Sequence, residues 1–253
     1  MLDVHLFPCL SDNYGLLARD RATGATACID TPEAEVILAE AARLGWSISL
    51  ILNTHWHPDH AGGNARVKAA TGAAIVAPAA EAQKIGEVDR TVAEGDEVRL
   101  GDTVFRVIDT RGHTLGHISY HAPEAGVAFV GDTLFAMGCG RLFEGTPAMM
   151  WASLGKLAAL PPETRLYCAH EYTAANARFA LSLDRAPAVT ERAAQVFAAR
   201  EAGRPTVPTT VALEQATNPF LRAPQLAPAL GLQDVSDVDA FAAVRAAKDA
   251  FRG

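Results

Sequence analysis

Three histidines and an aspartate are concentrated in the segment THWHPDH, residues 54–60. His55 and His57 are two apart just after an apolar run, and in an extended backbone they project to the same side. Asp59 and His60 are adjacent and must point in different directions, which suits two neighbouring metal ions better than one. Because three of the chain's eight histidines are gathered here around a carboxylate, we interpret the segment as a metal site rather than a solvated loop.

Three more candidate ligands follow the ends of expected strands elsewhere in the chain. His113 comes after the run TVFRVID, Asp132 after GVAFVG and His170 after RLYCA. In α/β sheets the carboxyl ends of the strands are where functional sites assemble, so we expect these side chains to join the first group. Imidazole and carboxylate without thiolate suit zinc, iron or manganese.

The expected elements alternate and indicate a mixed α/β fold. A helix is predicted from the N-cap pattern Thr31-Pro32-Glu33 to about Leu44, and another near residues 148–159. After His170 the β-rich runs give way to helical patterns over 174–203 and 236–251, which predicts two domains, residues 1–171 and 172–253. The predicted strands are 14–19, 25–30, 48–53, 73–77, 103–109, 117–121, 126–131 and 165–169.

Composition and charge narrow the class of protein. The chain has 253 residues, 49% of them apolar, which is enough for a sizeable core. Its net charge of −7 argues against binding to nucleic acid, although residues 172–253 carry +1 and residues 1–171 carry −8. No apolar stretch approaches the length of a membrane span, and four scattered cysteines fit a reducing compartment. We therefore expect a cytoplasmic protein, and we expect a monomer that binds neither nucleic acid nor membrane.

The motifs THWHPDH, GHTLGH, GDTLF and CAHEY resemble the successive metal motifs of the metallo-β-lactamase superfamily. The resemblance implies an αββα four-layer sandwich with two divalent metal ions, zinc foremost, with iron or manganese as alternatives. It also implies a division of the seven ligands: His55, His57 and His113 for one ion, Asp59, His60 and His170 for the other, and Asp132 as the bridge.

Two ions about 3.5–4 Å apart can share a bridging water and lower its pKa to about 7, so that hydroxide is available for hydrolysis. Asp59 would also orient this hydroxide and receive its proton. The residues assigned to catalysis are Asp59 and the bridging Asp132. A serine triad or a nucleophilic cysteine is not required.

The segments CGRLFEGT, CAHEYT, NPFLR and VRAAKDAF resemble the bacterial form of the type II glyoxalases, the hydroxyacylglutathione hydrolases. The resemblance implies hydrolysis of S-(2-hydroxyacyl)glutathione, typically the D-lactoyl thioester formed in methylglyoxal detoxification. It implies a C-terminal helical domain that binds glutathione. Arg245 and Lys248, three apart on an expected helix, share one face of it. The implied substrate-binding residues are Arg141, Phe143, Tyr172, Arg245 and Lys248.

Other functions within the same fold remain alternatives. A glutathione persulfide dioxygenase resembles this site but uses one iron and lacks the full helical domain, so residues 172–253 count against it. A nucleic-acid processing member is disfavoured by the acidic charge. A binding protein with purely structural metals would not need an open site, since structural zinc sites are usually closed. Trp56 takes a position that the metal pattern does not use, and His117 is interpreted as a supporting histidine.

Overall fold

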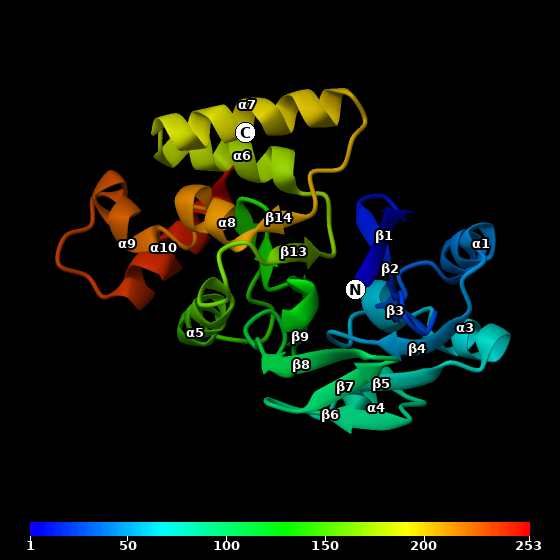
Figure 1. Ribbon diagram of the computed structural model, residues 1–253. Helices are drawn as coiled ribbons and strands as arrows, with labels where there is room; N and C mark the ends of the chain where they lie inside the picture. The colour runs from blue at the N-terminus through cyan, green and yellow to red at the C-terminus, as the bar shows by residue number, and fades with distance from the viewer. The chain divides into compact units, whose positions relative to one another are not determined.

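The computed structural model describes residues 1–253 and divides into two compact units (Figure 1). Unit 1 comprises Met1–Asp109 and Leu115–Gly131, and unit 2 comprises Thr110–Thr114 and Asp132–Gly253. No helix in the chain combines the length and apolar character needed to cross a bilayer.

Unit 1 contains a six-stranded sheet with the order β1-β2-β3-β4-β5-β6. The first three strands pair antiparallel and the last three join in parallel. Helices α1 and α3 pack on this sheet around an apolar cluster that includes Ile37, Ile51 and Val67. The elements are β1 (Leu2–Cys9), β2 (Asn13–Asp20), β3 (Thr26–Ile29), α1 (Ala34–Leu44), β4 (Ile48–Leu52), α2 (Pro58–Ala61), α3 (Asn64–Thr71), β5 (Ala74–Pro78), α4 (Ala82–Ile85) and β6 (Arg90–Val92).

Four further strands of unit 1 form an antiparallel meander in a second sheet. They are β7 (Glu97–Leu100), β8 (Thr103–Asp109), β9 (Ile118–Ala122) and β10 (Val127–Gly131), with the short 3-10 helix η1 (Pro123–Ala125) between the last two. The fully buried Tyr120 on β9 donates a hydrogen bond from its hydroxyl to the carbonyl of Asn53 (2.8 Å), just beyond β4. This bond ties the second sheet to the end of a strand in the first.

The start of α1 differs from the sequence prediction. The predicted N-cap was Thr31, but the helix begins at Ala34 with Glu33 at the N-cap position and no side-chain cap. Thr31 is buried, and its hydroxyl donates to Oδ1 of Asn64 on α3 (2.8 Å). The helix prediction through Leu44 is confirmed, whereas the cap prediction is wrong because a tertiary hydrogen bond takes the Thr31 hydroxyl.

Unit 2 is mostly helical, as predicted for the end of the chain, and also contains two pairs of short strands. Three buried phenylalanines from separate segments pack together in it. The ring centroid of Phe220 lies 6.0 Å from that of Phe179 and 6.2 Å from that of Phe241. The elements are β11 (Leu134–Phe135), β12 (Gly138–Cys139), α5 (Pro147–Ala158), β13 (Arg165–Cys168), α6 (Thr173–Leu183), α7 (Pro187–Glu201), β14 (Thr209–Thr210), α8 (Val211–Thr217), α9 (Ala223–Leu226), the 3-10 helix η2 (Ala227–Leu230) and α10 (Asp237–Ala250).

Candidate active site

The THWHPDH segment of unit 1 leaves the sheet at the end of β4 and enters the short helix α2. Pro58 occupies the first position of α2, where its missing N–H costs nothing and its fixed φ favours the helix. His57 is the N-cap residue, and Asp59 and His60 lie in the first turn. The change from extended to helical backbone separates the side chains of Asp59 and His60 from those of His55 and His57.

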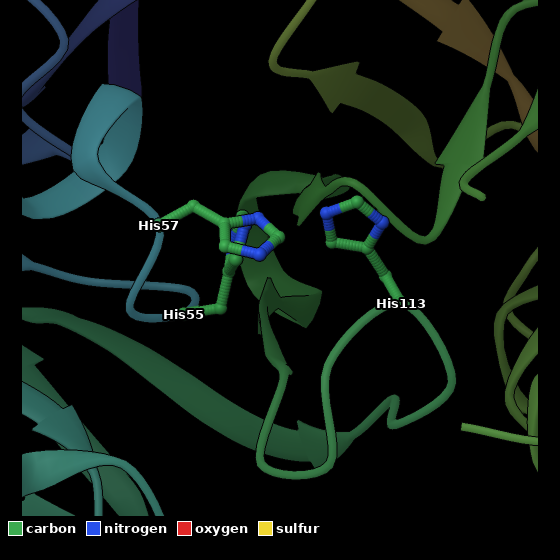
Figure 2. A group of neighbouring side chains, drawn as sticks. All are labelled: His55, His57 and His113. Carbon is green, nitrogen blue, oxygen red and sulfur yellow. The ribbon is translucent and has the colours of Figure 1, made fainter. Parts of the chain in front are cut away.

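His55 and His57 turn their rings toward each other (Figure 2). Nε2 of His55 lies 2.9 Å from Nδ1 of His57, and His55 is completely buried. Two imidazole nitrogens that each lie ~2.0–2.1 Å from one zinc ion are about 2.9–3.4 Å apart for N–Zn–N angles of about 90–110°. The spacing of these two donor atoms therefore fits a shared metal ion.

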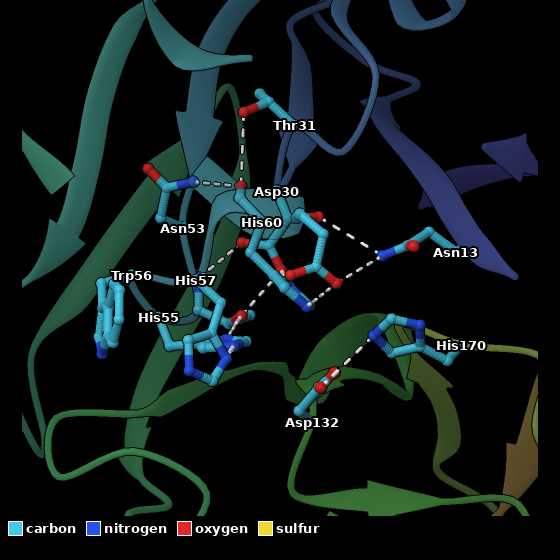
Figure 3. Close-up of polar contacts among 12 residues, drawn as sticks. Asn13, Asp30, Thr31, Asn53, His55, Trp56, His57, His60, Asp132 and His170 are labelled. Atoms are coloured by element: carbon cyan, nitrogen blue, oxygen red, sulfur yellow. Dashed lines mark hydrogen bonds and ion pairs between the residues drawn. The ribbon is translucent and has the colours of Figure 1, made fainter. Parts of the chain in front are cut away.

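Asp59 and His60 form the second pair of candidate ligands in unit 1. Nε2 of His60 lies 3.5 Å from Oδ2 of Asp59. The same oxygen accepts a hydrogen bond from Nδ2 of Asn13 (3.1 Å), the first residue of β2 (Figure 3). Asn13 thereby fixes the direction of the Asp59 carboxylate, a role that the sequence alone did not reveal.

Asp30 is a further functional residue that the sequence analysis did not single out. Its Oδ2 lies 2.8 Å from Nδ1 of His60 and accepts from the Thr54 hydroxyl (2.7 Å). The Thr54 oxygen in turn lies 3.0 Å from Nδ1 of His55. The signal that could have revealed Asp30 is its position at the end of β3, beside the parallel strand β4 that leads to the metal motif.

The contacts of Asp30 with His60 and of Thr54 with His55 set the tautomers of the two histidines. An ionised carboxylate can only accept, so Nδ1 of His60 carries the hydrogen and Nε2 keeps its lone pair. Because the Thr54 hydroxyl donates to Asp30, its oxygen accepts from Nδ1 of His55, which likewise leaves Nε2 of His55 with a lone pair. Both rings are thus prepared to bind a metal through Nε2.

Glu81 bonds to two backbone segments of unit 1, one of which lies between the candidate ligands His55 and His57. Its two carboxylate oxygens accept from the backbone N–H of Trp56 (2.9 Å) and of Gly116 (2.8 Å). Gly116 packs so closely that a Cβ there would come within 2.6 Å of the Glu81 side chain. The Trp56 ring lies over the Lys84 ammonium (4.5 Å) and beside His57, so the tryptophan fastens the loop without supplying a ligand.

Unit 2 brings His113, Asp132 and His170 together. Oδ2 of Asp132 lies 3.4 Å from Nε2 of His170 (Figure 3). The same oxygen lies 3.4 Å from Nε2 of His113. All three side chains are at least nine-tenths buried. One carboxylate oxygen equidistant from two imidazole donors has the arrangement that a bridging ligand requires.

The other ring atoms of these histidines are also held. Nδ1 of His113 lies 2.9 Å from the carbonyl oxygen of Arg141, which fixes the hydrogen on Nδ1. The ring of His170 stacks on Tyr172 with a centroid separation of 4.7 Å and an interplanar angle of 3°.

A cavity of about 390 Å³ in unit 2 opens beside His113 and Asp132. All five residues predicted to bind substrate line it: Arg141, Phe143, Tyr172, Arg245 and Lys248. Arg245 and Lys248 lie on α10, and the Arg245 guanidinium donates to the carbonyl of Cys139 (3.0 Å). Phe143 is 62% exposed and Tyr172 is 37% exposed, which leaves both rings available to a ligand.

The electrostatics of this cavity favour an anion. Burial lowers the pKa of the Lys248 ammonium, and the nearby positive charges of Arg245 and Arg141 lower it further. An anionic group bound in the cavity would relieve this repulsion. Burial raises the pKa of the Cys139 thiol to about 11, despite the adjacent Arg245. Cys139 is therefore protonated at neutral pH and serves as a wall of the cavity rather than as a nucleophile.

Two family models together account for nearly the whole chain. The model described as Metallo-beta-lactamase superfamily matches residues 23–170, and the model described as Hydroxyacylglutathione hydrolase C-terminus matches residues 171–251. The first match covers more than half of the chain. The pair defines the class of protein as a metallo-β-lactamase fold followed by a second, family-specific segment.

Curated relatives match the chain along their full length. The hydroxyacylglutathione hydrolase of Maricaulis maris (strain MCS10) is 56% identical over 98% of both chains. That of Erythrobacter litoralis (strain HTCC2594) is 55% identical over 99% of this chain and 100% of its own. The chain therefore belongs to the hydroxyacylglutathione hydrolase family within the metallo-β-lactamase superfamily.

Solved structures agree with this fold. The crystal structure of ETHE1 from Myxococcus xanthus has a TM-score of 0.66 at 28% identity and covers 98% of this chain and 99% of its own. The BLEG-1 B3 metallo-beta-lactamase has a TM-score of 0.67 at 20% identity and covers 87% and 99%. The predicted α/β sandwich of the metallo-β-lactamase type with a helical C-terminal region is confirmed. The family and the histidine and aspartate clusters together indicate a dimetal site.

Proposed function

We propose that this chain hydrolyses S-(2-hydroxyacyl)glutathione thioesters, typically S-D-lactoylglutathione, to glutathione and the hydroxy acid. The observation that carries the proposal is the cavity of unit 2, which is lined both by the metal-type ligands His113 and Asp132 and by four cationic side chains. Glutathione has two carboxylates, and its thioester would lie next to groups that bind metal. The identity of more than 50% with curated hydroxyacylglutathione hydrolases supports the same reaction.

We assign two metal ions to the seven predicted ligands: His55, His57 and His113 for one, Asp59, His60 and His170 for the other, with Asp132 shared. Bound divalent ions lower the pKa of water toward neutrality and polarise a carbonyl. The side chains supply the rest of the chemistry. Asp59, whose Oδ2 accepts a hydrogen bond from Asn13, would receive the proton of the attacking water. The donor spacing in each unit supports this ligand set.

On the substrate side, Arg245 and Lys248 would bind the carboxylates of glutathione, and Arg141 is close enough to Lys248 to lower its pKa. Phe143 and Tyr172 offer exposed rings against the peptide. The departing thiol has an ordinary pKa near 8.5, so it is a tolerable leaving group once the thioester carbonyl has been attacked. Residues 172–253 would form the glutathione-binding domain.

The proposal extends to the setting of the reaction. Zinc is the expected metal, with iron or manganese as alternatives that the same donors accept. The four buried, free cysteines fit a reducing cytoplasm, and we expect a monomer. The reaction would be the second step of methylglyoxal detoxification.

The test is to purify the protein, measure metal per chain and follow the loss of thioester absorbance of S-D-lactoylglutathione. The matched substrate is the D-lactoyl thioester of N-acetylcysteamine, which lacks both glutathione carboxylates and should be hydrolysed with a much lower kcat/KM. Removal of metal with a chelator should abolish turnover, and adding it back should restore it. A metal-replete sample that does not hydrolyse S-D-lactoylglutathione would overturn the proposal.

A further inference from the structure

A tight hairpin in unit 2 connects Asp132 to the substrate cavity. Strands β11 and β12 pair Leu134 with Cys139 and Phe135 with Gly138, so Ala136 and Met137 form a two-residue turn. Met137 has φ +56°, in the left-handed region that favours glycine. It is also completely buried, so its N–H must find a hydrogen-bond partner within the protein.

Side chains from the helical part of unit 2 support this turn. Glu214 on α8 accepts from the Met137 N–H (2.9 Å). The Asn218 amide, directly after α8, donates to the carbonyls of Phe135 (3.1 Å) and Gly138 (2.9 Å). The Asn176 amide on α6 donates to the carbonyl of Ala136 (3.1 Å). Four consecutive backbone positions of the hairpin are therefore bonded to buried side chains.

Glu214 and Asn218 form one connected unit. Both are completely buried, and Nδ2 of Asn218 also lies 2.8 Å from Oε2 of Glu214, so its two hydrogens are shared among three acceptors. The other oxygen of Glu214 pairs with the buried guanidinium of Arg192 and accepts from the Thr209 hydroxyl. A buried carboxylate with this many partners has a single position, and so does the turn that it holds.

The two residues that follow the hairpin, Gly140 and Arg141, lie close to the candidate metal ligands Asp132 and His113. The Gly140 N–H donates to the carbonyl of Thr133 (3.1 Å), and a Cβ at Gly140 would come within 1.9 Å of the Asp132 carbonyl oxygen. The next residue, Arg141, supplies the carbonyl that lies 2.9 Å from Nδ1 of His113. A displacement of the turn would therefore move both the Asp132 backbone and the acceptor that orients His113.

We infer that Asn218 and Glu214 are positioning residues for Asp132 and His113, acting through the hairpin of residues 134–139. The inference rests on the proposed function in taking those two side chains as metal ligands. It gives the helical segment a role beyond contact with substrate, because α8 and the residue after it fix the geometry of metal donors.

The test compares Asn218→Leu with Thr217→Val. Thr217 is the neighbouring buried residue. Its hydroxyl accepts from Arg192 in the same polar network and donates to the carbonyl of Leu213, not to the hairpin. We expect Asn218→Leu to weaken metal binding by about 10–100-fold in chelator competition, as is typical when a group that orients a ligand is lost. Thr217→Val should retain metal affinity within about threefold. Its unfolding midpoint should fall by about as much as that of Asn218→Leu. If Asn218→Leu does not fold, Asn218→Ser, which keeps one donor, should show a smaller loss in the same direction.

Metal affinity of Asn218→Leu equal to that of the wild type would overturn the inference. So would an equal loss in Thr217→Val, because the effect would then be general destabilisation. The readout is metal binding and not turnover, so it separates this inference from the proposed reaction. A wild-type protein that binds metal but does not hydrolyse the thioester would refute the reaction alone.

Discussion

Oδ2 of Asp30 lies 2.8 Å from Nδ1 of His60, and the other oxygen of the same carboxylate accepts from the backbone N–H of Thr54. Asp30 has φ +57°, a conformation that aspartate tolerates better than most residues. The unusual backbone turns the carboxylate toward the metal motif. Asp30 therefore orients His60 directly and His55 through the Thr54 hydroxyl.

The first prediction is that Asp30→Ala lowers metal affinity by about 10–100-fold and lowers kcat with it, because both imidazoles lose the partner that fixes their tautomers. Chelator competition on the purified variant measures the affinity. The matched control is Glu35→Gln, which removes a carboxylate that pairs with Arg66 on the surface of the same unit. Metal affinity in Asp30→Ala equal to that of Glu35→Gln would contradict the assigned role.

The second prediction concerns Glu81, whose carboxylate bonds to the N–H groups of Trp56 and Gly116. Glu81→Gln retains one acceptor oxygen, so one of the two N–H groups loses its partner. Leaving a buried donor unsatisfied costs about 1–3 kcal/mol. We expect the free energy of unfolding in urea to fall by this amount, and metal affinity to fall with it because the loop between His55 and His57 is released. Unchanged values of both would show that Glu81 does not hold the loop.

The third prediction separates the two cations on α10. Lys248→Ala should raise KM for S-D-lactoylglutathione by about tenfold or more with little change in kcat, because a charge-assisted hydrogen bond is worth about 1.5–3 kcal/mol. Arg245→Ala should raise KM and also lower kcat, because the buried guanidinium donates to the Cys139 carbonyl at the end of the hairpin.

Steady-state kinetics of both variants test this difference, with Lys156→Ala on α5, outside the cavity, as the control. An unchanged KM in Lys248→Ala would remove that residue from the substrate site. Identical kinetic changes in the two variants would show that Arg245 has no additional role in the hairpin.

The fourth prediction is a dependence of stability on pH through Asp20 in unit 1. Burial opposes ionisation of this carboxyl, but hydrogen bonds from Thr103, Thr23 and Ala22 outweigh it and lower the pKa to about 2, from an unfolded value of 3.8. Because the folded pKa is depressed, the stabilisation is complete above pH 3.8 and is lost as the pH falls through 2.

Urea unfolding of the wild type and of Asp20→Asn between pH 7 and pH 2 measures this contribution. The wild type should be the more stable protein at pH 7, and the difference should shrink below pH 3.8. A difference that stays constant across this range would show that ionisation of Asp20 does not contribute.

The sequence by itself determined the donor types and the segments that carry them. The histidines of THWHPDH, the strand that precedes them and the helix ending at Leu44 were all predictable, because local periodicity and residue chemistry act over a few positions. The same holds for Arg245 and Lys248 on one helix. The motif resemblance added the superfamily and the reaction class, which the family matches then supported.

Only the tertiary structure decided which groups hold those donors in place. Asp30 and Glu81 bond to the metal motif across 24 or more positions of the sequence, and Glu214 bonds to Met137 across 77 positions. The Thr31 hydroxyl bonds to Asn64 rather than capping its own helix for the same reason. A buried polar group must find a partner wherever the folded chain provides one, and the choice depends on distances in space that spacing along the sequence does not encode.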